Sequence, residues 1–390
     1  MIGRRGFLAF LALLPLGSVQ ATPFAVPELA PPSGAMMVYH LGHSLVGADM
    51  PHMLAQLAPK GHAYNTQLGS GTPLQQHWEP DQDILHFDQV NHPPIWRDAR
   101  EAVGSGDYDA VILTEMVELR DAIRYFKGAR YFRRWADLAR AGSADTRLYL
   151  YETWHPLDTP DGWLARIDTD LEQLWLGGLA GSDTRRNPNR PAYLIPAGQV
   201  MAAVARAAEA GEIDGLNARE DLFARSETGA LDTIHINDLG AYVVALTHYA
   251  VLYQRAPLDL PHQLMRADGS AADSLTSQGA EQVQRIVAIA NEYNVPLYPI
   301  SGGKQWGMGS RLPVKDGAAI VDLSGMNRVI EVNEQYHYAV VEPGVTQRQI
   351  IDHIKSKNLN LMLNVTGATS DTSLIGNAMD RGVGYFDSRA

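Results

Sequence analysis

Val38-Tyr39-His40-Leu41-Gly42-His43-Ser44-Leu45 is an apolar run that ends in a glycine turn and presents one serine. A strand followed at once by a turn of small residues is how many α/β proteins place a nucleophile at the carboxyl edge of their sheet. We therefore take Ser44 as the candidate nucleophile. A serine is a weak nucleophile unless a base lies within hydrogen-bond reach and a third group orients that base. Downstream, Leu231-Asp232-Thr233-Ile234-His235 offers both, with His235 as the base and Asp232 as its partner.

Apolar runs alternate with helical patterns on either side of this stretch. The expected strands are Met36–Leu41, Ala63–Leu68, Tyr108–Leu113, Arg147–Glu152 and Ala192–Ile195. Helices are expected near Met50–Ala58, Asp121–Ala141, Trp163–Leu179, Gln199–Ala210 and Asp238–Tyr253. This alternation predicts an α/β fold in which helices cover both faces of a parallel sheet, a flavodoxin-like three-layer α/β/α sandwich. Ligands bind such sheets at the carboxyl ends of the strands.

The order Ser, Asp, His resembles the SGNH (GDSL-type) hydrolase superfamily. The match lies in Gly42-His43-Ser44-Leu45 and in Asp232-x-x-His235, and the resembling domain covers about residues 35–257. The resemblance implies a serine ester hydrolase that needs no cofactor. In it, Ser44 attacks, His235 takes and returns the proton, and Asp232 fixes the tautomer of the imidazole. A small-molecule ester or an acylated carbohydrate is the expected substrate.

The oxyanion hole of such a hydrolase is expected after the second strand. Gly69-Ser70-Gly71-Thr72 follows that strand, and a glycine lets a backbone N–H approach a substrate oxygen. The resemblance implies that Gly69 or Gly71 acts together with the N–H of Ser44, and the choice between the two glycines stays open.

The third strand ends in Leu113-Thr114-Glu115-Met116, where the sequence departs from the family. Most members have an asparagine in this block as an oxyanion donor, whereas an ionised Glu115 only accepts hydrogen bonds. Either Thr114 supplies the donor, or the hole has two donors, or the activity is impaired. A non-catalytic carbohydrate-binding domain with the same fold is therefore a further alternative.

Other histidines and aromatic residues are less informative. Trp154 and His155 follow the fourth strand, where substrate contact and simple packing are equally compatible with the pattern. His40, His43 and His52 match no recurrent spacing of metal ligands, so no metal site is expected.

Composition and the N-terminus bear on partners and location. The net charge of −12 argues against a nucleic-acid partner, and the absence of cysteine excludes disulfides and thiolate metal sites. Arg4-Arg5-Gly6-Phe7-Leu8 is a twin-arginine pattern followed by a short apolar run, so residues 1–21 are expected to be a signal peptide. We therefore expect a periplasmic or secreted protein with no membrane attachment after cleavage, with an uncleaved anchor as the alternative.

The character of the chain changes after a linker expected at residues 258–280. A helix at Glu281–Tyr293 leads to an apolar strand and then to Ser301-Gly302-Gly303-Lys304-Gln305-Trp306-Gly307-Met308-Gly309. A glycine-rich loop after a strand can direct its N–H groups at a pyrophosphate. The spacing matches neither a Walker A pattern nor GxGxxG, and a plain glycine-rich turn is the alternative.

Three further blocks follow in order: Val321–Arg328, Val341–Thr346 and Gly376–Tyr385. Residues 281–390 resemble the FAD-binding domain of the vanillyl-alcohol oxidase and para-cresol methylhydroxylase flavoprotein family. The resemblance implies a partial α+β FAD-binding domain and possible FAD binding. The implied FAD contacts are Ser301, Gly302, Gly303, Lys304, Gln305, Trp306, Gly307, Gly309, Gly344, Gly376 and Asn377.

The sequence ends before the point where that family places the rest of its FAD domain and its substrate domain. Oxidation of a para-substituted phenol by this polypeptide alone is therefore not expected, and a partner chain could complete the FAD domain. The alternative to a hydrolase is a flavoprotein oxidoreductase component that acts on para-substituted phenols, with a non-catalytic N-terminal module.

Overall fold

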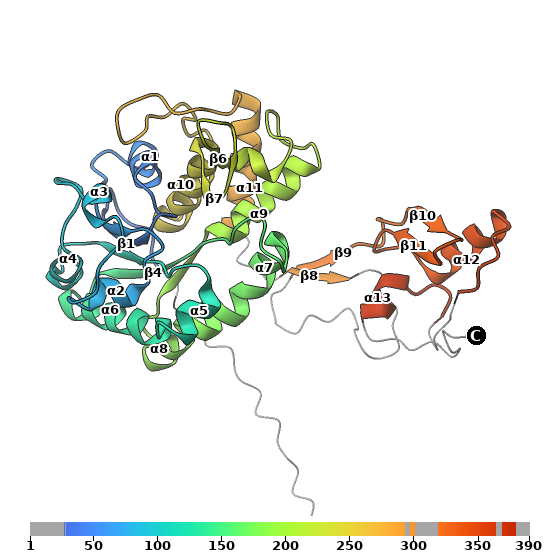
Figure 1. Ribbon diagram of the computed structural model, residues 1–390, viewed down its shortest axis with the longest axis horizontal. Coiled ribbons are helices and arrows are strands. Elements are labelled where there is room, and N and C mark those ends of the chain that lie inside the picture. The colour runs from blue at the N-terminus through green and yellow to red at the C-terminus, as the bar shows by residue number, and fades with distance from the viewer. Residues whose placement is uncertain (1–26, 28, 293–296, 301–318, 364–368, 380–390) are drawn as a thin grey trace, which may run out of the picture. The chain divides into compact units, whose positions relative to one another are not determined.

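The computed structural model describes residues 27, 29–292, 297–300, 319–363 and 369–379. The chain divides into two compact units, Met1–Glu292 and Tyr293–Ala390 (Figure 1). The expected signal peptide at residues 1–21 lies outside the described residues. In the described part of the chain, no helix has the length and apolarity that crossing a bilayer requires.

A five-stranded parallel sheet forms the centre of the first unit. Its strands are β1 (Met37–His43), β2 (Ala63–Gly69), β3 (Ala110–Leu113), β4 (Arg147–Glu152) and β5 (Tyr193–Pro196). They lie in the order β2-β1-β3-β4-β5, and each neighbouring pair is parallel. This confirms the predicted flavodoxin-like α/β sheet. The strand order reverses between β1 and β3, which is where doubly wound sheets open a crevice for ligands.

Helices cover both faces of this sheet. Alternate strand residues point to opposite faces, so Val38 belongs to one apolar cluster and Tyr39 to the other. One face packs against α1 (Asp49–Leu57), α9 (Ala197–Glu209) and α10 (Asp238–Tyr253), and the other against α4 (Ala99–Ser105) and α6 (Gly128–Gly142). Figure 1 shows the two helical layers on either side of the strands.

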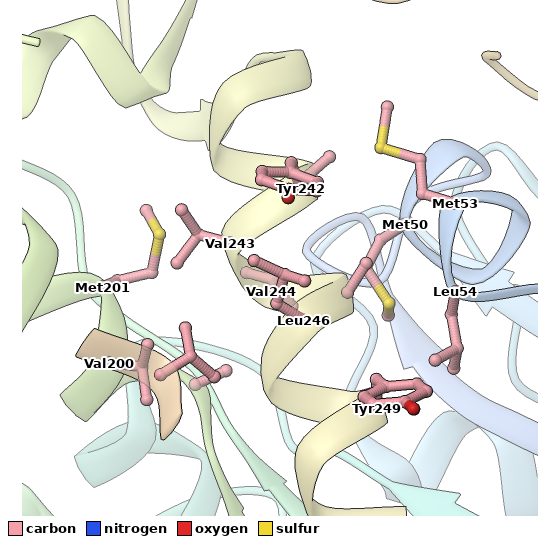
Figure 2. Packing of buried hydrophobic residues seen from close by; sticks show 14 of the residues in the cluster. Met50, Met53, Leu54, Val200, Met201, Tyr242, Val243, Val244, Leu246 and Tyr249 are labelled. Atoms are coloured by element: carbon pink, nitrogen blue, oxygen red, sulfur yellow. The ribbon is translucent and has the colours of Figure 1, made fainter. Parts of the chain in front are cut away.

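Helix α10 is the central element of the first layer. It is apolar around most of its circumference, and its side chains are buried along nearly the whole helix. Figure 2 shows Tyr242, Val243, Val244, Leu246 and Tyr249 of α10 between residues of α1 and residues of α9. Asn237 begins the helix, because its side-chain oxygen accepts hydrogen bonds from the N–H groups of Leu239 and Gly240.

Two expected helices are interrupted in the structure. The expected helix Asp121–Ala141 forms as α5 (Leu119–Arg124) and α6, separated where Lys127 has a φ of 56°. The expected helix Trp163–Leu179 forms as α7 (Trp163–Asp170), a π-helical segment η1 (Leu171–Ala180) and α8 (Gly181–Arg186). Several short elements were not expected from periodicity. Among the helices these are α2 (Leu74–Trp78), α3 (Phe87–Val90), α4 and the 3₁₀ helix η2 (Arg219–Leu222).

The end of the first unit differs from the expected boundaries. Helix α11 (Ser277–Glu292) packs against α9 and α10, and its Val283 and Val287 belong to the same apolar cluster as those helices. Leu264 and Leu275, from the segment expected to be a linker, are also buried there. The first unit therefore ends at residue 292 rather than at 257, because these apolar side chains are buried against its helices.

The second unit is small in its described part. Strands β8 (Leu297–Ile300) and β9 (Ala319–Asp322) are parallel, whereas β10 (Val329–Asn333) and β11 (Tyr338–Val341) are antiparallel. Helix α12 (Gln347–Ser356) begins with a capping box between Thr346 and Gln349, and α13 (Leu374–Met379) follows. This mixture of helices and strands agrees with the expected α+β character.

Candidate active site

Ser44, His235 and Asp232 form one continuous chain of hydrogen bonds. The Ser44 hydroxyl lies 3.0 Å from Nε2 of His235, and Nδ1 of His235 lies 2.8 Å from Oδ2 of Asp232. Because the carboxylate only accepts, Nδ1 of His235 carries the proton, and Nε2 is left to accept from the serine. The structure thus brings together the three residues that the sequence separates by up to 191 positions.

The position of Ser44 follows from the end of β1. His43, the last residue of that strand, is in register with Gly69 on β2, so Ser44 lies where the first strand leaves the sheet. The chain then turns tightly, with the Val46 N–H donating to the His43 carbonyl over 2.9 Å, and Gly47 takes a φ of +62° that favours glycine. The candidate nucleophile Ser44 therefore lies at the switch point between β1 and β3.

Two buried histidines hold this turn. His43 donates from Nε2 to the carbonyl of Glu115, and His77 on α2 donates from Nε2 to the carbonyl of Gly42 over 2.8 Å. Nδ1 of His77 accepts from the side-chain amide of Gln67. Burial lowers the pKa of both His43 and His77 to about 4. Both rings are therefore neutral near pH 7, and their role is to orient the backbone around the nucleophile.

His235 and Asp232 lie on β7 (Leu231–Ile236). This strand pairs antiparallel with β6 (Phe223–Arg225) just before α10. Oδ1 of Asp232 accepts hydrogen bonds from the N–H groups of Ile234 and His235, both at 2.9 Å. Burial raises the pKa of Asp232, but these backbone donors and the imidazole outweigh it, so the net shift is downward. The carboxylate is thus held ionised toward the imidazole.

The candidate oxyanion donors lie at the ends of the two strands that flank β1, or just after them. Gly69 ends β2, and a Cβ there would collide with Ile84 and Thr72. Gly71 has a φ of +57° and open space around its Cα. Thr114 follows β3, and its hydroxyl is buried without a hydrogen-bond partner among the described residues. No described residue therefore accepts a hydrogen bond from the Thr114 hydroxyl.

The carboxyl of Glu115, the residue after Thr114, lies against backbone N–H groups, one of them at the start of α2. Its Oε1 accepts from the N–H groups of Leu74 and Met116, at 3.1 and 2.9 Å, so the carboxyl binds the start of α2. Burial raises the pKa of Glu115 to about 7. The expectation that Glu115 impairs an oxyanion hole stays a prediction.

Trp154 and His155 have separate roles after β4. The Trp154 indole is fully buried and donates to the carbonyl of Ile234 over 2.9 Å. His155 is buried and lies 2.9 Å from Asp170, which also binds Arg166. Trp154 thus contacts the segment that carries the candidate base, a role that no local pattern could have revealed. Among the described residues, no cluster of potential ligands could hold a metal ion.

The expected FAD contacts are only partly described. The segment from Ser301 to Gly309 lies outside the described residues, as does the side chain of Asn377. Gly344 donates to the carbonyl of Met326, and the Gly376 N–H donates to the Ser373 hydroxyl. Because the Ser373 hydroxyl donates to the carbonyl of Pro343, the Gly344 and Gly376 segments are neighbours. The described hydrogen bonds of Gly344 and Gly376 are thus to other groups of the protein.

Comparison with known proteins separates the two ends of the chain. Residues 275–390 match the family described as "FAD binding domain". The chain is 44% identical to the 4-cresol dehydrogenase [hydroxylating] flavoprotein subunit of Pseudomonas putida over 112 residues. These residues make up 29% of this chain and 22% of that protein. The chain spans about a fifth of the length of the curated relatives it matches.

Two of the similar solved structures cover more than half of this chain at low sequence identity. A DUF4886 family protein from Bacteroides uniformis has a TM-score of 0.44 at 13% identity, covering 66% of this chain and 95% of that one. A candidate GDSL-like lipase from Parabacteroides merdae has a TM-score of 0.36 at 11% identity, covering 57% and 96%. The chain thus contains an α/β unit and, over residues 275–390, a segment that matches an FAD-binding domain.

Proposed function

We propose that the first unit is a serine ester hydrolase. Ser44 attacks the acyl carbon, His235 takes the hydroxyl proton and then gives it to the leaving alcohol, and Asp232 keeps the imidazole in the required tautomer. Water repeats these steps on the acyl-enzyme. The observation that carries this proposal is the unbroken set of hydrogen bonds from Ser44 through His235 to Asp232.

Stabilisation of the oxyanion is assigned to groups on both sides of β1. The N–H of Ser44, a glycine N–H from Gly69 or Gly71, and the unpartnered Thr114 hydroxyl are the proposed donors. The geometry favours Thr114 as the third donor because the free energy cost of a buried, unpaired hydroxyl is recovered if a reaction intermediate binds it.

The substrate class we propose is a small ester or an acylated carbohydrate. The side chains of His235 and Asp232 are 45% and 38% exposed, so the proposed base and its partner lie at an open surface. A site that is exposed to solvent suits a substrate whose acyl group is attached to a hydrophilic molecule such as a carbohydrate. Acetylated oligosaccharides and short p-nitrophenyl esters are therefore the substrates with which to begin.

The test compares the unmodified protein with Ser44→Ala on a short p-nitrophenyl ester. We expect the rate to fall by about 10³-fold or more, since the remaining groups cannot replace the nucleophile. Ser105→Ala is the matched control, because its hydroxyl bonds only to the Ala102 carbonyl and to the Asp107 N–H, on α4 and just after it. Equal rates for Ser44→Ala and the control would remove Ser44 from the mechanism.

A second proposed activity is FAD binding by the second unit. The family match over residues 275–390 supports it, and a partner chain carrying further flavoprotein domains is the proposed means of completing the fold. Bound FAD would supply redox chemistry, but no step through it follows from the described residues. Equilibrium dialysis of the purified protein against FAD, followed by flavin absorbance, tests the proposal. Absence of retained flavin both alone and with a flavoprotein partner would overturn it.

Export is proposed on the twin-arginine pattern of the first residues. Replacing Arg4 and Arg5 together with lysine is expected to keep the protein inside the cell. Fractionation with an antibody against the first unit measures this, and an unchanged distribution would contradict export by this route.

A further inference from the structure

The strand that carries Asp232 and His235 is held only weakly by its neighbour. The paired residues of the β6–β7 ladder are Phe223 with Ile236 and Arg225 with Leu231, and a register shift lies between them. Every residue of β7 is only partly buried. The middle of the strand, where the candidate base and its carboxylate lie, therefore depends on other contacts for its position.

Two such contacts come from the segment after β4. The Trp154 indole donates from Nε1 to the carbonyl of Ile234 over 2.9 Å, and the N–H of Leu157 donates to the carbonyl of Thr233 over 2.7 Å. Both acceptors lie between Asp232 and His235 in the sequence. The two donors thus fix the peptide groups that join the proposed carboxylate to the proposed base.

Trp154 is itself rigidly placed. Its ring is fully buried within the apolar cluster that includes α9 and α10, so the surrounding side chains restrict its rotation. A side chain anchored in the core can therefore transmit that rigidity to a partly exposed strand through one hydrogen bond. Phenylalanine would fill much of the same space but could not donate.

We propose that Trp154 is a positioning residue for the hydrolase reaction: its indole N–H fixes the Ile234 peptide so that His235 stays within reach of Ser44. The inference rests on the proposed function, because it concerns the geometry of that same base. It assigns no contact between Trp154 and a substrate. Loss of the donor should therefore affect turnover more than substrate binding.

The test is Trp154→Phe with Trp135→Phe as the matched control. Trp135 is also fully buried and also donates its indole N–H to a backbone carbonyl, that of Leu74 at 3.0 Å. Both variants lose the same type of bond, so both should lose similar stability. We expect kcat on a p-nitrophenyl ester to fall about 10- to 100-fold in Trp154→Phe with KM within about twofold, since small misplacements of a catalytic group are costly. The control should lose clearly less kcat than Trp154→Phe, because Trp135 bonds to α2 and not to the strand that carries His235.

Hydrogen exchange provides a readout that does not depend on activity. The amides of Ile234 and His235 donate to Asp232. Their protection from exchange therefore reports whether the segment from Asp232 to His235 keeps its conformation. We expect faster exchange at both amides in Trp154→Phe and unchanged exchange there in Trp135→Phe. If Trp154→Phe fails to fold, replacing Trp154 with benzothienylalanine keeps the bicyclic ring and removes only the donor.

The outcomes separate this inference from the proposed function. Full activity of Ser44→Ala would overturn the hydrolase proposal, whatever Trp154 does. Loss of activity in Ser44→Ala, with Trp154→Phe or its benzothienylalanine counterpart as active and as protected as the control, would overturn the positioning role alone.

Discussion

Each polar side chain around Ser44 has one identifiable role. His235 and Asp232 provide the proposed proton transfer, whereas His43 and His77 donate to backbone carbonyls and stay neutral near pH 7. The distinction comes from the surroundings, since burial disfavours the charged form of a histidine. The three histidines are thus divided into one proposed reacting group, His235, and two supporting groups, His43 and His77.

Thr114 allows a prediction in which activity and stability change in different directions. Thr114→Val keeps the shape of the side chain but removes the hydroxyl, which has no partner among the described residues. If that hydroxyl binds the oxyanion, kcat/KM should fall about 10²- to 10³-fold. The free energy of unfolding should stay the same or rise, because a buried unpaired hydroxyl costs about 1–3 kcal/mol.

Ester hydrolysis and urea unfolding of the same preparation measure both quantities. Thr114→Ser keeps the donor and is the matched control for activity. An unchanged kcat/KM in Thr114→Val would show that the oxyanion hole uses only the two backbone N–H donors.

At the level of elements, α10 fixes the end of the strand that carries His235. The helix begins at Asp238, directly after the strand that carries His235, and Asn237 caps it. The Asn237 side chain also donates to the carbonyls of Asp221 and Phe223, which joins the start of the helix to β6. Burial of α10 between α1 and α9 thus sets where the candidate base enters the site (Figure 2).

Leu246 is a direct measure of this packing. Leu246→Ala should lower the free energy of unfolding by about 2–5 kcal/mol, because it removes a fully buried side chain and leaves a cavity. Ile289→Ala on α11 is the control, since that side chain is 58% exposed and its loss should cost about 0.5 kcal/mol or less. Urea unfolding followed by tryptophan fluorescence measures both, and a similar loss in the two variants would contradict the packing described for α10.

For the first unit as a whole, buried titratable groups make stability depend on pH in both directions. Burial lowers the pKa of His43, His62, His77 and His248 to about 4. A depressed histidine pKa contributes stability that is complete above about pH 6.5 and is lost as the pH falls through 4. Burial raises the pKa of Glu115 to about 7 and that of Glu152 to about 8. A raised carboxyl pKa contributes stability that is lost as the pH rises through those values.

We therefore predict a stability maximum near pH 6, with decreases toward pH 4 and toward pH 9. Urea unfolding at intervals across that range measures it. In Glu152→Gln the loss on the alkaline side should be smaller, because one buried carboxyl no longer ionises, while the acidic side should be unchanged. A decrease of equal size above pH 7 in both proteins would contradict this assignment.

The sequence by itself determined the sheet and the identity of the proposed reacting groups. The hydrophobic period of a strand and the residues of a turn are local properties of the sequence. The five strands, the place of Ser44 after the first and the Asp232-x-x-His235 spacing were therefore predictable. The structure confirms the sheet. The glycine-rich blocks after residue 300 likewise indicated the FAD-binding resemblance, which the family match bears out. The catalytic roles stay predictions.

Only the tertiary structure decided which groups support that site and where the first unit ends. Trp154 meets Ile234 across 80 positions, His77 meets Gly42 across 35, and the direction of the Glu115 carboxyl depends on Leu74. The same holds for α11, which packs against α9 and α10. Such contacts arise from the packing of whole elements, which the local periodicity of a chain does not encode.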